Sequence, residues 1–278
     1  MPLEIGAFYL VDHRLIGLAM VALLLAAGEI GYRLGSARVD APDSLRSLMS
    51  GTGAATLGLL GLLLGFALSM AIARWDIRRD VIVDESNAIG TLSLRAGLLE
   101  DPLRGELREA LRVYTDARIA MGGSRSQPDA LRAARLESEA LHSRIWSIVE
   151  RANQPTTMNA TLSSLISSAN ELIDLHELRL ASVENNLPAA LFLLLLSMAT
   201  FAIAFLAWSF GAAAQRGRTP MLLLALLIGG VLLLIMDVNR PQRGRIKAGV
   251  TPLERVEESL SARRPHEPAS WSGAWRDD

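Results

Sequence analysis

Residues 54–73 read AATLGLLGLLLGFALSMAIA and contain no charged side chain. A helix needs about 20 apolar residues to cross roughly 30 Å of hydrocarbon, so this stretch is long enough to span a bilayer. Residues 187–214 and 219–236 are also uncharged and pass the same test. Because Leu and Ala dominate these stretches and only 5% of the chain is aromatic, the sequence predicts membrane helices and no sheet.

A fourth apolar segment, residues 15–32, is weaker because Glu29 interrupts it. We interpret it as the first membrane span, with a cleaved signal peptide as the alternative, since small residues at 26–28 resemble a cleavage point. The acidic residues Glu4 and Asp12 before the apolar run favour the span, because a signal peptide usually begins with basic residues.

The four segments divide the chain into consecutive parts. Residues 1–75 hold spans one and two, 76–186 a water-soluble helical domain, 187–237 spans three and four, and 238–278 a tail with a short helix. In the second part, apolar stripes at helical spacing predict amphipathic helices beginning near residues 103, 131 and 162. The expected fold is therefore an all-α membrane protein with four transmembrane helices and a helical cytoplasmic domain inserted between helices 2 and 3.

We expect the helices of spans two and three to continue into this domain. No proline interrupts residues 54–99, and the stripe of residues 162–180 leads towards span three, where Pro188 would occupy the first turn. An even number of spans places both chain ends on one side. Positive charge near the membrane is denser after spans two and four than in the two short loops, which predicts cytoplasmic termini and a cytoplasmic central domain.

Charge and cysteine content exclude several functions. The chain has 28 basic and 29 acidic residues and no long basic run, so there is no electrostatic basis for binding nucleic acid. The absence of cysteine excludes disulfides, thiolate metal sites and cysteine nucleophiles.

The remaining polar residues form no catalytic or metal-binding pattern. None of the four histidines has a partner at metal-ligand spacing, and His176 falls on an apolar stripe, which favours a hydrogen-bonded core histidine. Asp80, Asp84 and Glu85 could bind a cation, but they follow two arginines, a pattern more typical of a solvated, self-paired helix face. We therefore expect no enzyme activity, no metal and no cofactor.

Small and apolar residues in span two form two stripes. Gly58, Gly61 and Gly65 lie at i, i+3 and i+7, where small residues let helices pack closely. Gly58 also begins a stripe with Leu62 and Phe66, with Ser69 one turn further. If several copies surround an axis, Leu62 and Phe66 form apolar rings that could close a pore by dewetting. Without oligomerisation, that stripe faces lipid.

Glu29 is the one charge inside a span and is a functional candidate for that reason. A structural alternative is an ion pair with Arg33 one turn later. A proton-coupled, stator-like subunit would rest on this carboxylate.

Two stretches resemble bestrophin anion channels. Residues 62–90, LLLGFALSMAIARWDIRRDVIVDESNAIG, resemble the second membrane helix of that family and its cytoplasmic extension, through Gly65, Phe66, Arg74, Trp75 and Asn87. Residues 237–253, DVNRPQRGRIKAGVTPL, resemble the loop after the last span, through Asp237, Arg240 and Pro241. As a whole, the chain is similar to bacterial bestrophin-like membrane proteins of uncharacterised function.

This resemblance implies a homopentamer in the bacterial inner membrane, with a pore along span two and small inorganic anions as the permeating ions. The neck phenylalanines of the family fall on Leu62 and Phe66, and its first neck position falls on Gly58. The proline that usually begins the neck and the acidic calcium clasp of animal members have no equivalent here, so calcium gating is not expected.

The first functional hypothesis is thus an oligomeric, anion-conducting channel with an apolar neck, in contact with membrane lipid. The alternative is a non-conducting membrane sensor or scaffold that recruits a partner through its helical domain.

Overall fold

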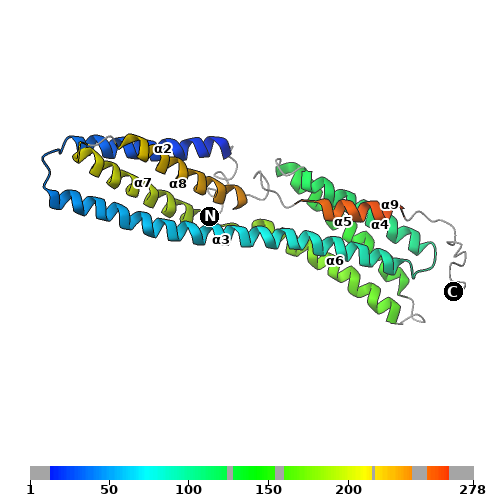
Figure 1. Ribbon diagram of the computed structural model, residues 1–278. Helices are drawn as coiled ribbons and strands as arrows, with labels where there is room; N and C mark the ends of the chain where they lie inside the picture. The colour runs from blue at the N-terminus through cyan, green and yellow to red at the C-terminus, as the bar shows by residue number, and fades with distance from the viewer. Residues whose placement is uncertain (1–12, 124–127, 154–159, 215–216, 240–248, 263–278) are drawn as a thin grey trace, which may run out of the picture. The chain divides into compact units, whose positions relative to one another are not determined.

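The computed structural model describes residues 13–123, 128–153, 160–214, 217–239 and 249–262, and all regular secondary structure in these ranges is helical (Figure 1). The chain divides into two compact units. Unit 1 comprises residues 1–77 and 182–247, and unit 2 comprises residues 78–181 and 248–278. Arg240 and Pro241, which carry part of the family resemblance, lie outside the described residues.

Unit 1 contains the apolar helices. These are α2 (His13–Ser36), the first part of α3 (Asp43–Ala96), α7 (Ala189–Ala212) and α8 (Arg218–Asn239). Within the described residues, four helices are long and apolar enough to cross a membrane, with their apolar segments in α2, α3, α7 and α8. The predicted all-helical membrane protein with four spans is therefore confirmed.

α3 is a single helix of 54 residues, against the roughly 20 that cross the hydrocarbon of a bilayer. Its sequence contains no proline, and its first turn carries Asp43, whose charge favours a helix N-terminus. The prediction that the helix of span two continues well beyond the apolar stretch is confirmed.

The expected continuation into span three is wrong. The helix α6 (Ala160–Glu184) ends before Pro188, and α7 begins directly after it. Pro188 has φ −57° and ψ 136°, an extended conformation that cannot continue a helix, and proline also disfavours helical backbone at the preceding residue. The backbone N–H of Leu187 donates instead to Oδ1 of buried Asn239 on α8, at 2.9 Å.

Three glycines set the packing of α2 on α7. A Cβ added at Gly31 would lie 2.4 Å from the carbonyl oxygen of Ala204, and one at Gly35 would lie 2.0 Å from that of Trp208. On α7, a Cβ at Gly211 would lie 2.2 Å from the carbonyl oxygen of Tyr32. These distances leave no room for a side chain, so glycine allows the two backbones to touch.

The glycines of span two behave differently. A Cβ added at Gly58, Gly61 or Gly65 would meet no atom of another part of the described chain within 4 Å. Close packing at these glycines thus has no basis within one chain and stays a prediction for contacts between copies.

Unit 2 is a helical bundle with its own apolar core. It comprises the second part of α3, most of α6, and the helices α4 (Leu103–Gly123), α5 (Pro128–Ala152) and α9 (Thr251–Ala262). Fully buried leucines and isoleucines join these helices, among them Ile89, Leu92, Leu107, Leu111, Ile145, Ile148, Leu165 and Leu253. The helices predicted from the apolar stripes near residues 103, 131 and 162 are confirmed, as is the short helix predicted in the tail, which is α9.

Candidate functional site

The predicted neck residues lie on one face of α3, and that face is exposed. Leu62 and Phe66 leave 56% and 59% of their surface uncovered, and Gly58 and Ser69 are exposed on the same stripe. The opposite face of the helix carries Leu60, Leu64, Ala67 and Ala71, which are buried in the core of unit 1. α3 therefore has one face packed against its own chain and another available to lipid or to a second copy.

The residues that carry the family resemblance have different environments. Nε of Arg74 donates to Oδ1 of Asn185 at 3.2 Å. Trp75 packs against the core of unit 1, and its indole N–H has no acceptor among the described residues. Asn87 is exposed, and Asp237 is half-buried near the end of α8. Among the described residues of unit 1, Arg74, Trp75 and Asp237 thus have separate contacts.

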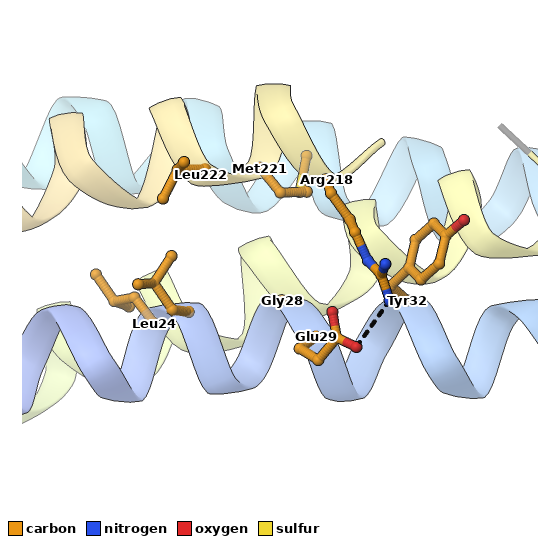
Figure 2. Close-up of a pocket in the computed structure, with 8 residues that line it drawn as sticks. Leu24, Gly28, Glu29, Tyr32, Arg218, Met221 and Leu222 are labelled. Carbon is orange, nitrogen blue, oxygen red and sulfur yellow. Dashed lines mark hydrogen bonds and ion pairs between the residues drawn. The ribbon is translucent and has the colours of Figure 1, made fainter. Parts of the chain in front are cut away.

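Glu29 is paired, as its spacing to Arg33 predicts, and it also has a second partner. Its Oε1 accepts a hydrogen bond from Nε of Arg33 at 2.7 Å and from Nη2 of Arg218 at 3.0 Å. Arg218 begins α8 and its guanidinium lies 5.1 Å from the centre of the Tyr32 ring (Figure 2). The pair with Arg33 follows from local spacing, whereas Arg218 is 189 positions away and no sequence pattern links the two.

A pocket of about 310 Å³ lies beside this ion pair, between α2 and α8 (Figure 2). Glu29, Tyr32 and Arg218 line it together with five apolar or small residues, Leu24, Leu25, Gly28, Met221 and Leu222. The pocket thus combines an apolar wall with charged groups.

Glu85 is fully buried, so the prediction that it lies on a solvated helix face is wrong. Its Oε1 accepts from the Tyr114 hydroxyl at 2.9 Å and from Nε of Arg118 at 2.6 Å. Its Oε2 accepts from Nη1 of Arg179. Asp84, by contrast, is exposed. Apolar Ile82, Ile89 and Leu92 share helical spacing with Glu85, so this periodicity, and not the run of charges, indicates the buried face.

Two histidines complete this buried cluster. His142 on α5 and His176 on α6 lie edge to face, with ring centres 4.6 Å apart. The expected core position of His176 is confirmed, since it is 1% exposed. Its expected hydrogen bonding is wrong, because neither ring nitrogen has a partner in the described part of the chain. Burial, then the charge of Arg118, lowers the pKa of both rings, that of His176 to about 4.

A protein-family comparison identifies the chain. The model of the Bestrophin-like domain matches residues 31–253, most of the sequence. The chain belongs to the bestrophin-like family. The matched range of this bestrophin-like protein contains the exposed α3 stripe and the Glu85 cluster, and it begins just after Glu29.

Two solved structures have a fold similar to that of this bestrophin-like chain. Two crystal structures, each described as that of a membrane protein, both have a TM-score of 0.66. One is 11% identical and covers 88% of this chain and 97% of its own, and the other is 12% identical and covers 91% and 99%. At such identity the likeness concerns the fold alone. No curated protein matches the chain.

Proposed function

We propose that this bestrophin-like protein is a homopentameric, anion-conducting channel of the bacterial inner membrane, with its pore along α3. The observation that carries the proposal is the exposed stripe of Leu62 and Phe66, at 56% and 59% exposure, on a helix whose opposite face is buried. Membership of the bestrophin-like family supports it.

In such an assembly, Leu62 and Phe66 from each copy would form successive apolar rings around the axis. A hydrophobic constriction of this kind gates by expelling water, so its closure depends on ring size and apolarity. Gly58 precedes these two residues on the stripe and Ser69 follows them, and both are small. The pore would therefore be narrowest at Leu62 and Phe66. Anions would be favoured by arginines near the pore entrances, with both termini and unit 2 in the cytoplasm.

Conductance of the purified full-length protein in a planar bilayer tests this function. We expect Phe66→Ala to raise the open probability or the unitary current, because the ring becomes wider and less apolar. Phe201→Ala on α7 is a matched control, since Phe201 is also 60% exposed but lies off the proposed axis. A chloride gradient should set the reversal potential close to that expected for an anion.

The absence of current in both the wild type and Phe66→Ala would contradict the proposal. An equal response to Phe201→Ala would remove Phe66 from the pore, and a reversal potential set by the cation would contradict anion selectivity.

A second candidate function, a non-conducting scaffold, has one observation in its favour. An open groove of about 750 Å³ follows α6 in unit 2, lined by Ser163, Ile166, Ser167, Asn170, Glu171, Asp174, Leu175 and Leu178. A protease site inserted at residues 124–127 distinguishes the channel from the non-conducting sensor or scaffold when protease is added to spheroplasts. Cleavage from outside would contradict the proposed topology and favour a sensor, whereas protection would support a cytoplasmic unit 2.

A further inference from the structure

The pocket between α2 and α8 has two chemically different ends. Leu25 and Leu222 are exposed on its wall, and Leu24 and Met221 close it from within. The other end is polar, with the carboxylate of Glu29 and the guanidinium of Arg218 (Figure 2). A ligand that fits both ends has an apolar chain and a polar head.

The ion-paired group at the polar end has a net positive charge when Arg33 is included, which does not line the pocket but shares Glu29 with Arg218. Arg33 and Arg218 both donate to the same oxygen of Glu29, so one carboxylate faces two guanidiniums. The two arginine side chains remain 75% and 67% exposed. Each guanidinium has five N–H donors, and its bond to Glu29 uses one of them. The head of the ligand is therefore expected to be an anion that accepts hydrogen bonds.

The position of the charges along the helices matches the surface of a bilayer. Glu29 and Arg33 lie in the last two turns of α2, and Arg218 is the first residue of α8. Both helices are long and apolar enough to span a membrane. Their charged ends then lie at the headgroup level, where aromatic rings such as Tyr32 concentrate, while Leu25 and Leu222 lie at the depth of the acyl chains.

We propose that this pocket binds an anionic phospholipid, with its phosphate against Arg218 and Arg33 and one acyl chain along Leu25 and Leu222. An arginine close to the bilayer surface attracts anionic lipids by about 1 kcal/mol. Lipid binding at this pocket does not depend on conduction, since the pocket is formed by α2 and α8 and not by α3. An ethanolamine phospholipid fits less well, because its ammonium group cancels the charge that the arginines attract.

Native mass spectrometry of the full-length protein in detergent tests which lipid headgroup the pocket prefers. With equal amounts of phosphatidylglycerol and phosphatidylethanolamine carrying the same chains, we expect about fivefold greater retention of phosphatidylglycerol, the effect of one arginine near a lipid phosphate. Arg218→Gln should abolish this preference because the pocket becomes neutral. Glu29→Gln should increase it, a direction that loss of a merely structural ion pair would not produce.

Arg38→Gln is the matched control, since it changes the net charge equally but lies outside the pocket. Equal retention of both lipids by the wild type, or the same loss of preference in Arg38→Gln, would overturn the proposal. So would a reduced preference in Glu29→Gln.

A second pair of variants tests the apolar wall. Leu25→Trp should fill the pocket and lower the retention of phosphatidylglycerol several-fold, whereas Leu23→Trp, at a similarly exposed leucine outside the pocket, should not. Glycerol phosphate, which has the head without the chains, should not displace the lipid. Displacement by glycerol phosphate would show a free-phosphate site and would overturn the assignment to a lipid.

Discussion

Glu85 shows how a single residue connects three helices of unit 2. Its carboxylate on α3 accepts hydrogen bonds from Tyr114 and Arg118 on α4 and from Arg179 on α6. A buried charge is tolerated when it is paired and hydrogen-bonded, and loss of one member from such a set costs about 3–5 kcal/mol because the others stay buried without a partner. The cluster therefore specifies one arrangement of these helices.

The two histidines of this cluster predict a pH dependence. His176 is surrounded by Arg118 on α4, His142 and Glu139 on α5, and Glu85 on α3, and burial is the main reason that its pKa falls to about 4. The pKa of a histidine in the unfolded chain is about 6.5. Between these values the unfolded state binds more protons, so stability falls as the pH decreases from about 6.5 to 4, by roughly 3 kcal/mol for His176.

Thermal unfolding of the full-length protein in detergent measures this effect. The midpoint should decrease between about pH 7 and about pH 5, and His176→Leu, which cannot be protonated and fills a similar volume, should decrease less. Parallel decreases in the two proteins would contradict a role of this ring.

At the level of residues, sequence patterns predict local relations better than distant ones. The exposed stripe of Leu62 and Phe66 and the pair of Glu29 with Arg33 follow from helical spacing, because both lie within one helix. Arg218 reaches Glu29 only after α8 has packed against α2, so a single sequence holds no sign of it. The run of charges around Glu85 predicts a solvated position, whereas the apolar period that it shares with Ile89 predicts burial, and the structure shows burial.

At the scale of elements, a helix could be predicted where the composition of a segment allows only one kind of secondary structure. No proline interrupts the 54 residues of α3. Its apolar part has the length of a membrane-spanning helix, and no other membrane-spanning structure needs an apolar stretch of that length. The boundary between α6 and α7 does not follow from the position of Pro188 alone, because proline is compatible with the first turn of a helix. The extended backbone there combines the steric effect of Pro188 on the preceding residue with the contact of Leu187 with Asn239, and only the first can be read from the sequence.

Glycine spacing was also insufficient to identify packing. Gly28, Gly31 and Gly35 repeat the spacing of Gly58, Gly61 and Gly65, yet the structure packs α7 closely against the first set and leaves the second uncovered. The spacing predicts a surface that can be approached closely, and the partner is decided by the rest of the fold.

A substitution in α2 tests the close packing of α2 and α7. Gly35→Ala places a Cβ where only 2.0 Å separates it from the Trp208 carbonyl oxygen, so the helices must move apart. We expect a loss of about 1–3 kcal/mol or more, as for other overpacked sites. Gly230→Ala is the control, because a Cβ there meets no atom of the described chain within 4 Å and alanine favours the helix.

The measurement is the thermal unfolding midpoint of both variants in the same detergent. A midpoint of Gly35→Ala equal to that of the wild type would mean that α2 and α7 are not in backbone contact. Destabilisation of Gly230→Ala to the same extent would point to a general effect of the added methyl group.

At the scale of the whole molecule, unit 1 carries a largely apolar surface and unit 2 a buried polar cluster. Large apolar side chains on unit 1 are exposed, among them Leu18, Leu62, Phe66, Leu193 and Leu227. Such a surface is costly in water but suits the hydrocarbon of a bilayer. Composition alone predicts this property. The number of copies that share the membrane cannot be deduced from one chain, because the same exposed face fits lipid and a second copy.

The proposed neck exists only if several copies of α3 surround one axis, so the subunit number is the most direct test. Native mass spectrometry of the full-length protein in a mild detergent measures it without any assumption about ions. We expect five copies in the assembled particle. A monomer would leave Leu62 and Phe66 facing lipid and would contradict the channel.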